Sequence, residues 1–353
     1  MRREHEHRTA TRGAPRDASI PLVRAGLVEP LLWEARSIGV PVDRLMERVG
    51  IPCSVEEDPF LVVPALPVWR FGAVVERRDA GPLFGFRAVM KMPFTRITSL
   101  RPLLRGCLNL KELLLRLCAV VRTQSNTSVY RLREEHDVVW LENAGPALLP
   151  ECASGSLYEI VGMIHLVRLA AGAEWRPRAI ALSCPWRPEL ETVPELGSGR
   201  IHFSRPARSI AVPRHLLPLP VTTPDEAAPL RHDPDDLQAL TGLSSELLRT
   251  LPAYLPERGP TIRRLATALG ISVRTLQRRL DLLGTSWTRI LERARFLRAQ
   301  ELLRDTDLKA AEIAMEVGYS HASSFCRSFR KLAGVSPSEY RRHFGQAHHE
   351  NQP

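Results

Sequence analysis

The chain has 353 residues, of which 44% are hydrophobic and 25% charged, and its formal net charge is +10 at pH 7. This length and apolar content predict about two domains, each with a core of its own. The six cysteines form no C-x-x-C pair, which argues against a zinc knuckle and a disulfide scaffold, and no apolar run is long enough to predict membrane insertion.

The first 19 residues are charged and polar and lack the apolar segment of a secretory signal. We expect residues 1–19 to form a disordered tail. The lack of a signal and the unpaired cysteines predict a cytoplasmic protein with reduced thiols.

Residues 20–216 combine helical and strand patterns, which predicts an α+β domain. The first predicted helix covers residues 21–48 and ends at a Gly-Ile-Pro break at residues 50–52. Asn109 and Glu112 resemble a helix-capping pair, followed by an apolar stripe at helical spacing. The stripe consists of Leu110, Leu113, Leu114, Leu117 and Val121. This stripe is consistent with burial in the core of the domain, which we favour. The alternative is that it forms a dimer interface.

Two strand-like runs, residues 129–134 and 138–142, flank residues 135–137 and predict a hairpin. A helix is predicted over residues 156–171, where we expect His165 to be buried with satisfied hydrogen bonds. Further strands are predicted over residues 179–183, 201–203 and 209–212. The tryptophans of this region suit core packing, with an aromatic pocket as the alternative; they are Trp33, Trp69, Trp140, Trp175 and Trp186.

Proline, aspartate and threonine gather over residues 217–236, which predicts a linker. A second domain is then expected over residues 237–345, followed by a flexible tail at residues 346–353.

The second domain contains an internal repeat. Residues 266–272 follow the pattern A-x-x-x-G-x-S, and residues 314–320 repeat it 48 residues later. Each copy predicts a helix, a turn at glycine, which tolerates positive φ, and a second helix capped by serine. The pattern is that of a helix-turn-helix unit. Beyond the serine the match slips by one residue, so the second helix of the second copy is expected to start one residue later.

The two units are joined by residues 287–303, which have good helix formers and an apolar stripe. We expect a rigid connecting helix. If it sets the two second helices about one DNA turn apart, roughly 34 Å, one chain can contact two successive major-groove segments.

Residues 261–341 resemble the double helix-turn-helix domain of the AraC/XylS family of bacterial transcription regulators. The motifs that carry the resemblance are Leu302-Leu303-Arg304-Asp305-Thr306-Asp307-Leu308, Ala311-Glu312-Ile313-Ala314, Gly318-Tyr319-Ser320, Phe325-x-Arg327-x-Phe329 and Gly334-Val335-Ser336-Pro337-Ser338-Glu339-Tyr340-Arg341. The resemblance implies an all-α domain whose two second helices meet the base edges of double-stranded DNA. Arg263 and Arg264 depart from the family pattern, in which acidic residues are common at these positions, and His321 departs from a small or acidic residue.

The outward residues of the two second helices are the candidate DNA contacts. Base contacts are expected from Arg274, Gln277, Arg278, Ala322, Ser323, Cys326 and Arg327. Phosphate contacts are expected from Ser272, Thr275, Arg279, Arg330 and Lys331. Arginine can pair with guanine and glutamine with adenine through two hydrogen bonds, whereas phosphate contacts position a protein without specifying sequence. Because Ala322 and Cys326 offer little hydrogen bonding, we expect the second unit to add more phosphate anchoring than base recognition.

Positive charge is concentrated in this domain. Residues 258–345 hold 17 Arg and Lys against 8 Asp and Glu, an excess of nine positive charges. Such a field attracts a polyanion, and binding through several phosphates weakens with salt. An acidic membrane surface is the competing partner, although nothing supports insertion.

The front domain resembles, more weakly, the amino-terminal effector domain of the branch of this family that includes the ornithine utilization regulators. The resemblance lies in the order and spacing of elements, among them Trp175-Arg176-Pro177, Ile201-His202-Phe203 and Ala211-Val212-Pro213. It implies an effector-binding or dimerisation domain, without identifying effector-binding residues. The predicted partners are double-stranded DNA, RNA polymerase, a small-molecule effector and a second copy of the chain, with no membrane.

Two other hypotheses remain. In one, the front domain serves only dimerisation or polymerase contact, and regulation is independent of an effector. In the other, the protein is a DNA-modifying enzyme, but the chain lacks the common nucleotide-binding, hydrolase and metalloprotease motifs. We therefore expect no enzyme activity, no cofactor and no metal site.

Overall fold

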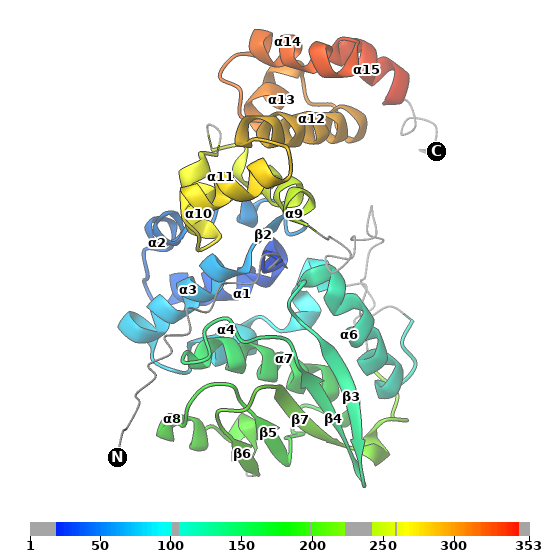
Figure 1. The fold of residues 1–353 in the computed structure, drawn as a ribbon. Helices are drawn as coiled ribbons and strands as arrows, with labels where there is room; N and C mark the ends of the chain where they lie inside the picture. Colours follow the sequence, from blue (N-terminus) through cyan, green and yellow to red (C-terminus); the bar gives the residue numbers. More distant parts are fainter. Residues whose placement is uncertain (1–18, 101–105, 198, 223–241, 258–259, 346–353) are drawn as a thin grey trace, which may run out of the picture.

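Figure 1 shows a computed structural model of the chain, which describes residues 19–100, 106–197, 199–222, 242–257 and 260–345. The predicted disordered tail up to residue 18, the predicted linker from residue 223 and the C-terminal tail lie outside these residues. The first part of the predicted linker is described: Leu217 O and Leu219 O accept hydrogen bonds from Lys111 N and Leu110 N, each 3.0 Å long.

The N-terminal domain is an α+β structure, as predicted. Its helices are α1 (Glu29–Ser37), α2 (Val42–Val49), α3 (Ala65–Val75), α4 (Phe84–Lys91), α6 (Leu110–Gln124), α7 (Ala153–Ala171) and α8 (Pro188–Glu191). Its strands are β1 (Leu22–Arg24), β2 (Val62–Pro64), β3 (Tyr130–Glu135), β4 (Val138–Asn143), β5 (Ala179–Ala181), β6 (Arg200–His202) and β7 (Arg208–Pro213).

Five strands form one sheet in the order β3-β4-β7-β5-β6, and β1 pairs with β2 in a separate ladder. Only β5 and β6 run parallel among these pairs. The predicted hairpin is confirmed, because β3 and β4 pair from Tyr130 opposite Asn143 to Glu135 opposite Val138. Helices α6 and α7 pack on this sheet (Figure 1).

The helix predicted over residues 21–48 is wrong in part. Its first residues form β1, and the helical stretch is divided into α1 and α2. The division has two causes: Gly39 adopts a left-handed φ of 81°, and Pro41 disfavours a helical conformation at the residue before it. The predicted end is confirmed, since Gly50 closes α2 in the left-handed region with φ 92°.

The apolar stripe of α6 lies in the core rather than at a dimer face. Its members Leu110, Leu113 and Leu114 have no exposed surface. The predicted cap is also present: Asn109 Oδ1 accepts from Glu112 N at 3.0 Å, and Glu112 accepts from Leu108 N at 2.9 Å. The front tryptophans do not all pack in the core, because Trp33 and Trp186 are 46% and 58% exposed.

The expectation for His165 is half correct. The side chain is largely buried, but its Nδ1 has no hydrogen-bond partner among the residues that the structure describes. Burial, followed by the charge of Arg168, lowers the pKa of His165 to about 4, so the imidazole is neutral at pH 7.

The C-terminal domain is all helical, as predicted. Its helices are α9 (Leu243–Thr250), α10 (Ile262–Ala268), α11 (Val273–Leu282), α12 (Trp287–Asp305), α13 (Ala310–Glu316), α14 (Ala322–Ala333) and α15 (Pro337–Phe344). The predicted connector is α12, which runs two residues further than expected. Helices α9, α10 and α11 lie next to the N-terminal domain, and α12, α13, α14 and α15 lie beyond them (Figure 1).

The hydrophobic core divides within the C-terminal domain rather than between the domains. Leu265, Leu276 and Leu280 of the first helix-turn-helix unit belong to the same apolar cluster as the N-terminal domain. The second unit has a small cluster of its own, which contains Phe325 and Phe329. The first unit is therefore packed on the N-terminal domain, and the second unit extends from it.

Polar contacts accompany this packing. Tyr254 Oη donates to Gly50 O at 2.9 Å, and Ser54 Oγ donates to Ala253 O at 2.5 Å. The turn glycine of the first unit, Gly270, lies so close to α3 that a Cβ built on it would be 2.6 Å from Leu66 Cδ2. The two hydrogen bonds hold the segment before α10 against residues 50–54, which follow α2, and the turn of the first unit lies against α3.

Candidate nucleic-acid interface

The first helix-turn-helix unit consists of α10, a turn and α11, and its local hydrogen bonds follow the predicted pattern. Gly270 has a left-handed φ of 68°, which glycine adopts without steric cost. Ile271 N donates back to Ala266 O at 3.0 Å, closing the turn. Ser272 then caps α11, because its Oγ accepts from Thr275 N at 3.0 Å.

The exposed side of α11 carries the residues predicted to contact bases. Arg274, Gln277 and Arg278 are exposed, whereas Leu276 and Leu280 on the opposite side are buried. Within the described part of the chain, neither Arg274 nor Arg278 forms an ion pair, so both guanidinium groups remain available. The predicted phosphate contacts lie beside them: Ser272 is exposed, and Thr275 and Arg279 are half-buried.

The second unit repeats this geometry with a different cap. Gly318 has φ 76°, and Tyr319 N donates to Ala314 O at 2.8 Å. The prediction that Ser320 caps the second helix is wrong. Residue His321 occupies the N-cap position and makes no side-chain capping bond, because the helix starts one residue later than in the first unit. That later start is what the slipped repeat predicted.

The outward side of α14 is less uniform than that of α11. Ser323 and Arg327 are exposed, as are the predicted phosphate contacts Arg330 and Lys331. In contrast, Ala322 and Cys326 are half-buried and pack against the apolar cluster of the second unit. All twelve predicted DNA contacts therefore lie on or next to α11 and α14, and their contact with DNA stays a prediction.

Helix α12 joins the two units by packing into both clusters. Ile290 and Ala294 near its start belong to the larger cluster, and Leu302 and Leu303 near its end belong to the smaller one. Arg295 lies over the ring of Tyr319, 4.7 Å from its centroid, and donates to Gly318 O at 2.9 Å. The arrangement fixes the turn of the second unit against α12.

Arg264 stands where acidic residues are common in the family, and its contacts differ from those of the equivalent residue in the second unit. In the second unit, Glu312 accepts a hydrogen bond from Lys309 N at 2.6 Å, which caps α13. The equivalent position in the first unit is Arg264, which pairs with Glu257 and lies over the ring of Tyr254. Glu257 also accepts from Cys53 N at 2.9 Å, so this arginine takes part in the contact between the domains.

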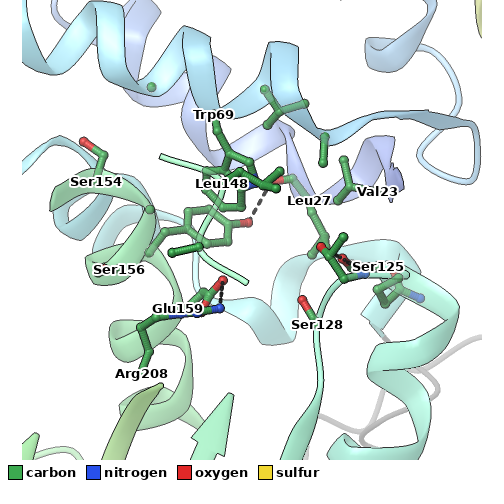
Figure 2. A pocket seen from close by; sticks show the side chains of 18 of the residues that line it. Val23, Leu27, Trp69, Ser125, Ser128, Leu148, Ser154, Ser156, Glu159 and Arg208 are labelled. Carbon is green, nitrogen blue, oxygen red and sulfur yellow. Dashed lines mark hydrogen bonds and ion pairs between the residues drawn. The ribbon is translucent and has the colours of Figure 1, made fainter. Parts of the chain in front are cut away.

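The N-terminal domain encloses a cavity of about 90 Å³ between α3, α6, α7 and the sheet (Figure 2). A water needs about 10 to 15 Å³ on the same measure, so there is room for a small organic molecule. The wall is largely apolar and aromatic, with contributions from Leu27, Val68, Trp69, Phe94, Leu148 and Tyr158. The ring of Tyr158 lies 6.1 Å from that of Trp69 and 5.5 Å from that of Phe94, measured between centroids.

A buried ion pair forms the polar part of the cavity wall. Arg208 Nε donates to Glu159 Oε2 at 2.7 Å, and Arg208 Nη1 donates to Gly145 O at 2.6 Å. Sequence reasoning did not find this site. Its members come from separate elements between Val23 and Arg208. Trp69 was named beforehand as one of several residues of a possible aromatic pocket, and Leu117 and Val121 were named only as part of an apolar helix stripe.

Two family models match the chain. The model for the arabinose-binding domain of AraC transcription regulators, N-terminal, matches residues 39–221, just over half of the chain, and a helix-turn-helix domain model matches residues 265–343. The chain belongs to the AraC family of transcription regulators. The predicted resemblance is thus confirmed for both domains of this AraC-family protein.

Similar proteins include other regulators. The ornithine utilization regulator of Pseudomonas aeruginosa is 37% identical over 105 residues, 30% of this chain and 31% of that protein. An uncharacterized HTH-type transcriptional regulator of Mycobacterium tuberculosis is 33% identical over 165 residues, 44% of this chain and 46% of that protein. Each match spans less than half the length of the relative.

Among solved structures, the transcriptional regulator CdpR from Pseudomonas aeruginosa aligns with a TM-score of 0.38 and 19% identity, covering 89% of this chain and 97% of that one. Across the described residues of this AraC-family chain, no helix is long and apolar enough to cross a membrane. The same residues contain no group of three or more His, Cys, Asp or Glu side chains that could hold a metal ion.

Proposed function

We propose that this AraC-family protein is a sequence-specific DNA-binding regulator that contacts two successive major-groove segments through α11 and α14. The observation that carries the proposal is the presence of two exposed basic helix faces on units joined by one packed helix. Helix α12 has 19 residues and is about 28 Å long at 1.5 Å per residue. That length suits recognition helices placed about one DNA turn, roughly 34 Å, apart.

The residues divide into two roles by chemistry and position. We assign base contacts to Arg274, Gln277, Arg278, Ala322, Ser323, Cys326 and Arg327. We assign phosphate contacts to Ser272, Thr275, Arg279, Arg330 and Lys331. Since Ala322 and Cys326 are half-buried and poor in hydrogen-bonding groups, the first unit supplies most of the base recognition and the second unit adds anchoring.

Two single substitutions separate these roles. Arg278→Ala is expected to relax preference at one base position, with a loss of about 1 to 3 kcal/mol on the preferred base. Lys331→Ala should weaken binding to all sequences evenly and reduce the salt dependence by about one phosphate contact. Both side chains are exposed, so both variants should fold. Equal effects of the two substitutions on specificity and salt dependence would refute the assignment.

We further propose that a small molecule bound in the N-terminal cavity modulates DNA binding through α3. Ala65, Val68 and Trp69 on this helix line the cavity. Its other side faces the first helix-turn-helix unit, where Leu66 approaches Gly270 and Arg70 Nη1 donates to Thr267 O at 3.4 Å. One helix thus forms a wall of the cavity and a contact of the DNA-binding unit.

Modulation requires that the ligand bind one arrangement of α3 more tightly than another, and that DNA binding differ between the two. The compounds to test include arabinose and ornithine, because they appear in the names of the matching family model and of one relative. DNA affinity is measured with and without each compound. A regulator whose N-terminal domain serves only dimerisation or polymerase contact would show the same DNA affinity with every compound that binds the cavity.

The remaining proposals concern organisation. We propose an effector-binding domain at residues 20–216, a linker at 217–236 and the DNA-binding domain at 237–345. We also propose that the protein acts in the cytoplasm as a homodimer that contacts RNA polymerase, and that it has no enzymatic activity.

A further inference from the structure

We propose that the N-terminal cavity takes an uncharged, mostly apolar organic molecule with a hydroxyl or N–H group at one end. This inference rests on the proposed effector function and names the chemistry of the effector. It is carried by the separation of apolar and polar groups around the cavity and by a phenol in the wall, that of Tyr130, which has no hydrogen-bond partner among the described residues.

The two ends of the cavity differ in polarity (Figure 2). Trp69 and Leu148 lie on the side of α3, together with Leu27 and Val23 from the start of the domain. Glu159 and Arg208 lie on the opposite side, toward the sheet. Between the two ends, Ser125, Ser154 and Ser156 line the wall, but their hydroxyls form hydrogen bonds within the protein, to Thr127, Glu76 and Ser183. A ligand with an apolar body against α3 and a single polar end toward the sheet matches this distribution.

The charged groups at the polar end neutralise each other. Glu159 accepts from Arg208 Nε at 2.7 Å and from Asn143 Nδ2 at 3.0 Å, and the other terminal nitrogens of Arg208 bond to Gly145 O and Glu159. Arg208 is the only basic residue in the wall among the described residues. A ligand carboxylate or ammonium group would therefore lose its hydration without meeting an unpaired opposite charge, which disfavours both.

A hydroxyl group remains available beside this pair. Tyr130 lines the cavity, and none of the hydrogen bonds found within the described residues involves its Oη. Burial, followed by the nearby charge of Glu159, raises the pKa of Tyr130 well above its ordinary value, so the phenol stays protonated. It can both donate and accept, which suits a hydroxyl or N–H group on a ligand.

This chemistry distinguishes the cavity from a sugar or amino-acid site. A free sugar carries hydroxyls around its whole ring, and those that face Val23, Leu27 and Leu148 would lose their hydrogen bonds to water. An amino acid carries two charged groups that the closed ion pair cannot satisfy. Arabinose and ornithine are accordingly expected to bind more weakly than an apolar alcohol of similar size.

Three naphthalenes with one skeleton test the inference: 2-naphthol, 2-methoxynaphthalene and 2-naphthoate. Binding to the full chain is measured by isothermal titration calorimetry without DNA. We expect 2-naphthol to bind at one site, 2-methoxynaphthalene about fivefold to tenfold more weakly because it has no donor, and 2-naphthoate more weakly still.

The variant Tyr130→Phe removes only the phenol oxygen, which has no hydrogen-bond partner among the described residues. It should weaken binding of 2-naphthol about fivefold to tenfold and binding of 2-methoxynaphthalene by less, because the ether oxygen can accept a hydrogen bond from the phenol but cannot donate one. Tyr319→Phe, in the second helix-turn-helix unit, makes the same chemical change away from the cavity and should alter neither affinity. The circular dichroism spectrum of each variant verifies folding.

Two results would overturn the inference: 2-naphthoate, arabinose or ornithine binding at least as tightly as 2-naphthol, or the folded protein binding none of the naphthalenes. If 2-naphthol binds with the expected Tyr130 dependence but leaves DNA affinity unchanged, the ligand chemistry is supported and effector control through α3 fails instead.

Discussion

The contact between α3 and the first helix-turn-helix unit predicts that two alanine substitutions at similar glycines have different costs. Gly270 has φ 68° and Gly284 has φ 67°, so alanine is strained by the same left-handed backbone at both positions. That strain costs about 1 to 2 kcal/mol. A Cβ at Gly284 meets open space, whereas one at Gly270 would lie 2.6 Å from Leu66 Cδ2.

Gly270→Ala must therefore also turn aside the end of the half-buried Leu66 side chain, which adds about 1 kcal/mol, the low end of an overpacking cost. We expect Gly284→Ala to lower the free energy of unfolding by about 1 to 2 kcal/mol. Gly270→Ala should lower it by about 2 to 3 kcal/mol, the sum of strain and overpacking. The measurement is urea-induced unfolding of the full chain, followed by circular dichroism.

A double substitution identifies the source of the difference. In a Leu66→Ala background the additional cost of Gly270→Ala should disappear, because the colliding methyl group is gone, while the cost of Gly284→Ala should stay the same. Equal losses for the two glycine variants in the wild-type background would refute the packing of α3 on the turn, and with it the proposed route from the cavity to the DNA-binding unit.

Two further predictions concern capping and pH. Ser272→Ala should cost about 1 kcal/mol of stability because Ser272 caps α11, while His321→Ala should cost little because the N-cap of α14 makes no side-chain bond; similar losses in thermal unfolding would contradict this. The pKa of His165 falls from 6.5 to about 4 on folding, so the unfolded state binds more protons in this window, and stability should decline as pH falls from 6.5 toward 4. His165→Leu should remove that decline, and parallel pH profiles of the two proteins would show that His165 does not cause it.

Local signals in the sequence predicted the DNA-binding domain well. Gly270 and Gly318 mark the two turns, because the left-handed backbone there favours glycine. The spacing of Leu276 and Leu280 defines the buried side of α11. The cap of α14 was mispredicted because a serine one residue before the N-cap looks the same in sequence as a serine at the N-cap. The slip of the repeat beyond the serine predicted the later start of α14, but it did not show that the serine cap is lost with that shift.

Long-range pairing explains the errors in the N-terminal domain. Leu22 lies in β1 because it pairs with Pro64, a partner 42 residues away that no local pattern reveals. The cavity could not be predicted for the same reason. Its residues Trp69, Tyr130 and Arg208 come from α3, β3 and β7 and meet only after the sheet has formed. The packing of Leu66 against Gly270 is also invisible in the sequence, since it joins two domains.

The central claim is that one chain recognises two successive DNA segments through α11 and α14. The most direct measurement is selection of bound sequences from a random DNA pool with the intact protein at physiological salt. The account predicts enrichment of a bipartite site whose halves lie about one helical turn, roughly 10 base pairs, apart, with the half that depends on Arg278 more strongly specified. An unenriched pool despite tight, salt-sensitive binding, with and without a cavity ligand, would contradict it.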